Sequence, residues 1–406
     1  MKRKAILLLS SASLLQAGSP DLATPLAPAA GYWITPTLDI RARYEFADID
    51  GKDPSHALTT RERMGLKTIE WNGFSALVEG EFSQALIDDY NGGAPGADPF
   101  DARNSLIADP ETNELNQAYL QYNGFDTLAR IGRQRIIYDN AAFIGNVGWR
   151  QNEQTYDAIS LSNKSIAGLT LNYAYVSQVN RIFGSEADGA PAVNPNVQDI
   201  GSDTHLFNAS YTGIQGVTLG GYIYLMDFEE VAGWNNDTFG MSAKGDVAGI
   251  TLYGEIAYQN DAGPLNADEA WYVHANATKA FGGQTLTLGV EFLDAGFQTP
   301  LATLHAFNGF ADAFVASRTA GTHGGLTDVY LTHSLPVCWG MKWANSFHAY
   351  GDNSLSTDLG WEIDSVLSKK FDDHFTAILK LAHFESENRA KNPTTTRASV
   401  ELNYAF

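Results

Sequence analysis

The chain has 406 residues, with 47 acidic against 26 basic side chains and a formal net charge of −21. This acidic balance argues against nucleic acid as a partner, because nucleic-acid binding requires a basic surface. No unbroken apolar run approaches the roughly 18 residues of a membrane-spanning helix. The length allows two or three soluble domains or one large barrel, and frequent alternation of apolar and polar residues favours the barrel.

The N-terminus has the pattern of a secretory signal peptide. A basic stretch at residues 2–4 precedes an apolar stretch at 5–15 that is too short to span a bilayer. We therefore expect residues 1–29 to be an export signal, with cleavage after Ala17 or near Ala29.

The mature region, 30–406, contains a single cysteine, Cys338. One cysteine cannot form an internal disulfide and has no partner for a zinc site, so we expect neither a metal nor a cofactor.

Segments of period two recur through the mature region, and the connections between them alternate short and long. The long connections are rich in Gly, Pro, Asp and Asn and cover 88–111, 138–152, 180–201, 260–268 and 296–324. Short periplasmic turns and long extracellular loops are typical of outer-membrane barrels. The pattern predicts an all-β fold, a transmembrane antiparallel β-barrel of about 18 strands in the cell outer membrane that encloses an aqueous channel.

The last nine residues, 398–406, form the clearest predicted strand. Apolar side chains at alternate positions end on the aromatic Phe406. A terminal aromatic residue in this register resembles the signal that the barrel assembly machinery recognises. We therefore expect that machinery, together with outer-membrane lipid and lipopolysaccharide, among the partners.

Charged residues in the first predicted strands are sorted onto one face. Turning an Arg or Lys toward mid-bilayer lipid would cost about 2 to 4 kcal/mol, so this face should line the lumen. The expected lumenal residues are Arg41, Arg43, Arg61, Arg63, Lys67, Glu79 and Glu81, with Asp39 and Glu45 in the same register. Glu62 has the opposite parity, and we place it near a rim.

Three further arginines, Arg130, Arg133 and Arg135, cannot all face the same way in one regular strand. We predict that Arg133 and Arg135 point inward and that Arg130 reaches the periplasmic interface. The inward arginines have two interpretations: a basic constriction that selects anions, or an ion-pair network that braces the wall. A guanidinium group suits carboxylates because its planar fork can bind both oxygens.

Several stretches resemble the alginate export family of outer-membrane barrels, namely 113–122, 132–140, 143–158 and 297–314. The resemblance implies an 18-stranded barrel whose arginine-rich constriction passes an anionic uronate polymer. It also implies that Arg133, Arg135 and Arg150 form the constriction, with Glu153 and Asp157 as their partners, and that periplasmic export components are candidate partners. The chain departs at 371–374, a minimal turn where secretion members carry a long one that helps to close the pore.

The long connection 296–324 contains an apolar segment, 299–314, with large side chains at near-helical spacing. We predict that it folds inward or caps the mouth as a short helix; the alternative is a structural cover that packs on neighbouring loops.

An enzyme is not expected, because His333 and Ser334 are adjacent and so lie on opposite faces, and no GxSxG motif occurs. The leading interpretation is passive diffusion of an anionic polysaccharide such as alginate. The alternative is a general uptake porin for small anionic or sugar-derived solutes. A channel for hydrophobic compounds would need an apolar lumen, which the inward charges disfavour.

Overall fold

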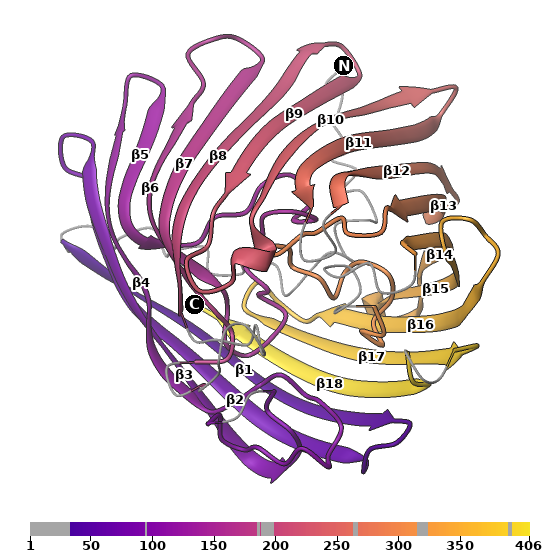
Figure 1. Cartoon of the computed structure of the whole chain (residues 1–406). Coiled ribbons are helices and arrows are strands. Elements are labelled where there is room, and N and C mark those ends of the chain that lie inside the picture. The colour runs from indigo at the N-terminus through magenta and orange to yellow at the C-terminus, as the bar shows by residue number, and fades with distance from the viewer. Residues whose placement is uncertain are drawn as a thin grey trace.

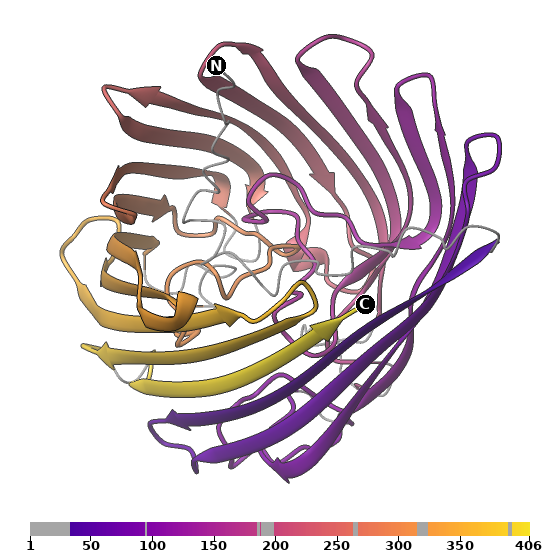
Figure 2. The same ribbon diagram turned by 180° about the vertical axis from the view of Figure 1, so that it is seen from behind.

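The computed structural model describes residues 33–93, 96–184, 187, 199–262, 267–314, 324–388 and 392–406. The expected signal peptide at 1–29 lies outside these residues. Eighteen strands form one antiparallel sheet that closes on itself between β1 and β18, which confirms the predicted fold class. Figures 1 and 2 show the strands as a continuous wall around an interior filled by connecting segments.

The wall is an up-and-down meander in which each strand pairs with its neighbours in the sequence. The first nine strands are β1 (Ile34–Ile49), β2 (Ser55–Thr68), β3 (Phe74–Asp89), β4 (Thr112–Gly124), β5 (Thr127–Gln134), β6 (Thr155–Asn163), β7 (Leu169–Asn180), β8 (Asp199–Ile214) and β9 (Val217–Met226). The others are β10 (Asn236–Val247), β11 (Ile250–Ala262), β12 (Ala267–Phe281), β13 (Gln284–Leu293), β14 (Leu326–Pro336), β15 (Lys342–Gly351), β16 (Asp358–Lys370), β17 (Phe375–Ser386) and β18 (Thr395–Ala405).

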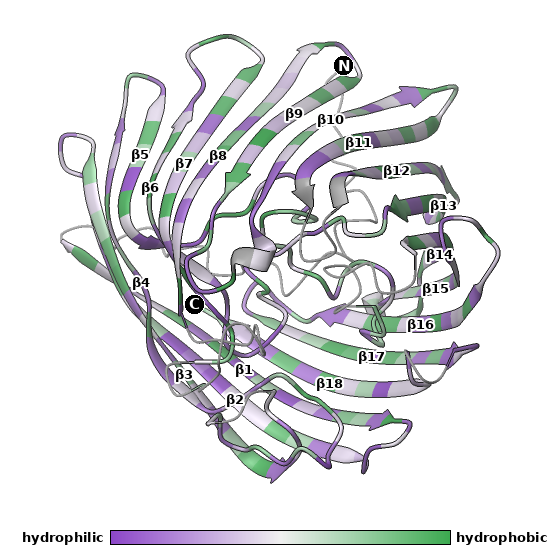
Figure 3. Ribbon diagram, in the orientation of Figure 1, coloured by the Kyte–Doolittle hydropathy of each residue, from purple (hydrophilic) through white to green (hydrophobic). Residues whose placement is uncertain are grey.

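Strand β18 shows how the sequence pattern sets the two faces of the wall. Val400 and Leu402 are 47% and 44% exposed on the outside, whereas the alternating Glu401 and Asn403 are 5% and 2% exposed inside. The same alternation of apolar and polar bands runs along the other strands in Figure 3. Backbone hydrogen bonds between Leu38 and Phe406 join the two ends of the sheet at 2.8 to 3.0 Å.

The connections largely follow the predicted alternation. The short turn 371–374 joins β16 to β17, and the long loops 90–111, 135–154 and 294–325 lie at the opposite end of the strands. The connection expected at 260–268 is shorter than predicted, because β11 extends to Ala262 and β12 begins at Ala267. Residues 263–266 lie outside the described part of the chain.

The prediction that Glu62 lies near a rim is wrong. This residue sits in the middle of β2, opposite Ile40 of β1 and Phe82 of β3. It shares the outward face with Met64, which is half exposed. A carboxylate therefore faces the apolar side of the wall near mid-strand.

Helical structure is confined to two short 3₁₀ turns among the described residues, η1 (Ala232–Trp234) and η2 (Cys338–Gly340). No helix in the described ranges has both the length and the apolar character needed to cross a membrane.

The segment 299–314 folds into the barrel, but the predicted helix is wrong. Left-handed backbone at Leu304, Asn308 and Asp312 interrupts any helical path. Its amide groups instead bond to the wall: those of Phe310 and Ala311 donate to carboxylates of β16 at 2.7 to 3.4 Å. The apolar side chains that suggested a helix are buried against the wall and neighbouring loops.

The apolar core lies inside the barrel, between the wall and the inward loops. Phe143 of the loop 135–154 packs against Tyr222 and Tyr272 of the wall with ring centroids 5.2 Å apart. The ring centroid of Phe297, in the loop 294–325, lies 5.9 Å from that of Phe143. Two loops far apart in the sequence therefore share one hydrophobic cluster with strands β9 and β12.

Candidate functional site: the charged lumen

The arginines of β1 hold the loop 135–154 against the inner wall. Nη1 of Arg41 donates to the carbonyl oxygens of Trp149 and Arg150 at 3.1 and 2.9 Å, and Nη2 donates to Gly148 at 3.1 Å. Arg43 donates to the carbonyl of Trp149 and to the carboxylate of Asp109. Both guanidinium groups are buried, and these hydrogen bonds compensate for most of their lost contact with water, although Nε of Arg43 has no hydrogen-bond partner.

A second set of ion pairs links β2 and β3 to the loops. Arg63 pairs with Glu81 and lies 3.5 Å from the carboxylate of Glu153. Arg135 donates to both oxygens of Glu153 through Nε at 2.7 Å and lies 3.5 Å from Glu79. Because β5 ends at Gln134, Arg135 leaves the strand and turns inward, which agrees with its predicted orientation.

Two of the remaining cations of β2 differ in their surroundings. Arg61 is fully buried and pairs with Asp39. Lys67 lies on the same lumenal face but is only half-buried near the short-turn end of the strand.

Arg150 joins three parts of the chain at one point. Its Nη1 lies 3.1 Å from Glu45 of β1 and 3.5 Å from Asp109, and its Nη2 lies 3.5 Å from Asp312. The guanidinium also covers the Trp149 ring, with 3.9 Å between Cζ and the ring centroid. This single side chain therefore connects the wall to the loops 90–111, 135–154 and 294–325.

Arg130 and Arg133 have the opposite orientations to those predicted. Arg133 shares the outward face with Ile131, which is 55% exposed, and binds Asp157 through two hydrogen bonds of 2.7 and 3.0 Å. Arg130 faces the lumen, donates to Gln121 at 2.8 Å and lies over the Tyr119 ring. The register of β5 with β4 fixes this alternation, so Arg133 and Asp157 form an ion pair on the outer face.

Charge is balanced within the buried layer. Its seven guanidinium groups belong to Arg41, Arg43, Arg61, Arg63, Arg135, Arg150 and Arg397. Eight carboxylates lie beside them: Asp39, Glu45, Glu79, Glu81, Asp109, Glu153, Asp312 and Glu401. Although burial alone would raise the pKa of Glu153, Arg135 and Arg63 hold it at about 2. These contacts are the ones expected of an ion-pair network that braces the wall. That these arginines also line the substrate path stays a prediction.

Arg397 and Asp109 also belong to this layer, although neither was predicted from the sequence. Arg397 of β18 donates to the carbonyl oxygens of Ala311 and Leu106 at 2.9 Å and to Glu45 at 3.2 Å. Its parity in the last strand was a usable signal, since it shares the polar face with Glu401. Asp109 had no such signal, because only the tertiary fold brings its loop to Arg43.

His305 links the two inward loops. Its ring stacks on Trp149 with 3.6 Å between centroids, and its Nδ1 lies 2.8 Å from a carboxylate oxygen of Asp312. Burial lowers the pKa of His305 to about 4, outweighing the attraction of Asp312. The imidazole is therefore neutral at pH 7 in the packed arrangement.

The opposite half of the inner wall carries acids that are bound by neutral donors. Glu255 accepts hydrogen bonds from Tyr222 and Tyr253 at 2.8 and 2.6 Å, and Glu291 accepts one from Tyr272 at 2.7 Å. The two halves of the lumen thus differ: arginines pair with acids on one side, while tyrosines accompany acids on the other. In the described ranges, no group of three or more His, Cys, Asp or Glu side chains is arranged to hold a metal ion.

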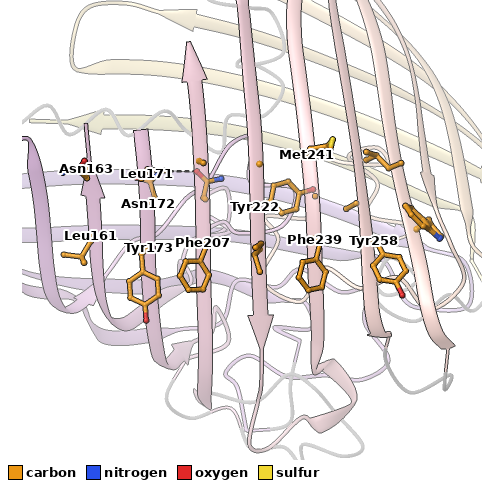
Figure 4. A pocket seen from close by; sticks show the side chains of 18 residues that line it. Leu161, Asn163, Leu171, Asn172, Tyr173, Phe207, Tyr222, Phe239, Met241 and Tyr258 are labelled. Carbon is orange, nitrogen blue, oxygen red and sulfur yellow. Dashed lines mark hydrogen bonds between the residues drawn. The ribbon is translucent and has the colours of Figure 1, made fainter. Parts of the chain in front are cut away.

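A cavity of about 1050 Å³ is lined mostly by outward-facing residues of β6 to β12. Figure 4 shows Tyr173, Phe207, Phe239 and Tyr258 in a row across neighbouring strands. These residues have the outward parity of Ile223 and Met241, which are exposed. An aromatic row on this face suits contact with lipid.

Comparisons with known proteins agree with this architecture. Among solved structures, OccAB4 of Acinetobacter baumannii aligns with a TM-score of 0.68 at 12% identity, covering 93% of this chain and 99% of that one. OccK8 (OprE) of Pseudomonas aeruginosa aligns with a TM-score of 0.67 at 10% identity, covering 92% of this chain and 98% of that one. OpdL of the same organism aligns with a TM-score of 0.65 at 16% identity, covering 92% of this chain and 98% of that one. At these identities the likeness establishes the fold, which is that of outer-membrane porins.

The sequence itself carries the family. A search of curated proteins finds no match. The model of the alginate export family matches residues 32–260, which is more than half of the chain. This match and the 18-stranded wall confirm the resemblance inferred from the motifs, and both family and fold are those of outer-membrane channels. The chain belongs to the alginate export family.

Proposed function

We propose that this protein is a passive outer-membrane channel for anionic saccharides, with alginate and related uronate chains as its substrate class. Family membership is the observation that carries the proposal. It is supported by the arginines gathered where two loops enter the barrel, because guanidinium groups bind carboxylates with matching geometry. Lumenal cations with no carboxylate of the described residues within ion-pairing distance, such as Arg130 and Lys67, are the candidates for attracting an anion along the path.

The way the loops are anchored supports diffusion through a fixed opening. Hydrogen bonds from the buried Arg41 and Arg43 to backbone carbonyls, and the ion pair of Arg150 with Glu45, fasten the loop 135–154, and the turn 371–374 is too short to reach across the pore. We propose outer-membrane lipid, lipopolysaccharide and the barrel assembly machinery as partners. Periplasmic export components would be needed only if transport runs outward.

The test is conductance of the purified protein in planar bilayers. Reversal potential in a salt gradient reports ion selectivity, and added alginate oligomers report substrate entry. We expect anion selectivity and a concentration-dependent block by alginate oligomers, with no block by neutral maltodextrins of similar length. A cation-selective pore that ignores alginate oligomers would contradict the proposal.

A general uptake porin for small anionic or sugar-derived solutes is the second candidate. Two observations favour it: the inward loops narrow the lumen, and the charges of the buried layer are balanced. Liposome swelling separates the two candidates. Entry of uronate monomers without block by longer alginate oligomers would assign the protein to small-solute uptake.

A further inference from the structure

Arg61 lacks hydrogen-bond partners at Nε and Nη1 but pairs with Asp39, whereas Arg181 has no carboxylate beside it among the described residues. Arg181 follows the last residue of β7, and its Nε and Nη1 atoms are buried without a hydrogen-bond partner among the described residues. Burial lowers the pKa of Arg181 to about 10, and among the described residues the nearby Tyr156 acts in the opposite direction. The guanidinium is therefore still protonated at pH 7, and no described carboxylate neutralises it.

The surroundings of Arg181 hold it at the mouth of the channel. The carbonyl oxygens of Arg181 and Ile182 accept from Nδ2 of Asn152, at 3.5 and 3.2 Å, which ties this segment to the loop 135–154. Cζ of Arg181 lies 4.9 Å from the ring centroid of Trp234, at the end of η1. Figure 1 shows η1 as the short coil, coloured for residues near 233, inside the ring of strands.

Trp234 is fixed by its neighbours. Its backbone amide donates to Val231 at 2.7 Å, its carbonyl accepts from Asn236 at 2.8 Å, and its ring meets Phe228 edge-on at 6.1 Å. The ring itself is only half-buried. A flat aromatic surface held beside a cation is a common arrangement for a sugar ring that carries a charge, since ring C–H groups pack on the aromatic face.

A second unsatisfied polar group lies next to the same segment. Nε2 of Gln298 donates to the carbonyl of Gly233 at 3.0 Å, so the amide lies beside Trp234. Its backbone makes two hydrogen bonds with Gln259, at 2.8 and 2.9 Å. The side-chain oxygen of Gln298 is buried and has no partner among the described residues. This oxygen can accept a hydrogen bond from a hydroxyl group.

An arginine with no counter-ion among the described residues is unusual in a chain with net charge −21. Buried polar groups are normally hydrogen-bonded, and a guanidinium with free donors is destabilising unless something binds it. We propose that Arg181 and Trp234, together with Gln298, form a carboxylate-binding subsite at the mouth of the channel that takes one acidic sugar unit. This inference rests on the proposed function and adds the residues that would recognise the uronate.

The test compares block of single channels by short alginate oligomers, added to either chamber in turn, between the wild type and variants. Arg181→Gln should raise the half-blocking concentration about 10-fold or more, the loss expected for a charge-assisted hydrogen bond. Arg181→Lys should recover part of the lost affinity for the oligomers. Trp234→Ala should weaken block by oligomers more than Trp234→Phe. Arg103→Gln is the matched control, because Arg103 is exposed and paired with Asp101 in another loop.

Acetate and glucuronate serve as small probes of the same chemistry. If their effect on the current also depends on Arg181 but not on Trp234, the site binds free carboxylates, and the part assigned to the sugar ring is overturned. Normal unitary conductance and heat-modifiable gel mobility show that each variant is folded. If Arg181→Gln and Trp234→Ala are blocked like the wild type, the subsite is refuted while the proposed function stands. If the wild type is not blocked by any carboxylate probe, both proposals fail.

Discussion

Replacing Arg150 by Ala should release the inward loops while leaving the barrel wall intact. Arg150 is buried at the point where Glu45, Asp109 and Asp312 meet. Its removal leaves three carboxylates close together with fewer cations and takes away the group that covers Trp149. The eighteen-stranded ladder of backbone hydrogen bonds includes none of these contacts.

The size of the effect follows from the burial of the pair. Removing one partner of a buried ion pair typically costs about 3 to 5 kcal/mol, because the remaining charge is left uncompensated. Neighbouring Arg43 and Arg397 also contact Glu45, so the lower end of this range applies. About 3 kcal/mol corresponds to a more than 100-fold shift toward the released loop state.

Single-channel recording measures this shift directly. Arg150→Ala should raise the mean conductance and add open-channel noise, since loops that fill the lumen would leave their packed position part of the time. The temperature at which the folded barrel loses its compact gel mobility should change little. Arg150→Lys keeps the positive charge but not the planar two-pronged guanidinium group. Its mean conductance and noise should therefore lie between those of Arg150→Ala and the wild type.

Arg103→Ala is the control, because Arg103 is a loop arginine whose side chain is 79% exposed and pairs with Asp101 of the same loop. It should leave conductance and noise unchanged. If Arg150→Ala also leaves both unchanged, the buried layer does not hold the loops in place. If Arg150→Ala prevents assembly altogether, the layer stabilises the wall as well as the loops.

Three further outcomes are expected. Arg130→Gln should lower anion selectivity in the reversal-potential assay, and Arg133→Gln should not, because only Arg130 faces the lumen. The His305 pKa of about 4 lies below its unfolded value near 6.5, so the packed loop loses about 3 kcal/mol as the pH falls from 6.5 to 4. Conductance should therefore rise over that interval, and His305→Phe should abolish the rise. Glu62→Leu should raise resistance to urea unfolding by about 1 kcal/mol by removing a lipid-facing charge, whereas Glu81→Leu should lower it, since Glu81 pairs with buried Arg63.

The wall was predictable from the sequence because lipid and lumen impose opposite requirements on alternate residues. In β1 and β18 every charged side chain between Asp39 and Glu45, and between Arg397 and Glu401, falls on one parity. That alternation indicated both the strands and the side that faces inward. The family resemblance added the strand number and drew attention to Arg135 and Arg150.

Orientation became unpredictable where strands are irregular or end. Arg133 and Arg135 have the same parity, yet one points outward and the other inward. The reason is that β5 ends at Gln134, so Arg135 is no longer bound by the alternation. A β-bulge in the pairing of β3 with β4, between Glu79 and Gly80, also shifts the phase of the neighbouring strands. Neither feature is visible in the spacing of the arginines.

The inward loops were beyond local reasoning for a different reason. The segment 299–314 has helical spacing of apolar residues, but its partners are carboxylates and aromatic rings of strands distant in the sequence. Those partners satisfy its backbone groups without a helix. A pattern of apolar residues indicates burial, and the geometry of burial depends on what the wall offers.

The balance of the buried layer bears on how such a channel could select anions. Guanidinium groups that are neutralised by adjacent carboxylates contribute little net field at the pore axis, because opposite charges a few ångströms apart largely cancel at longer range. Selectivity would then depend on cations with no carboxylate beside them in the described part of the chain, such as Arg130 in the lumen and Arg181 at the mouth. The two groups of arginines can therefore be separated by experiment. Changing a paired arginine should alter conductance and noise, whereas changing Arg130 or Arg181 should alter selectivity or block.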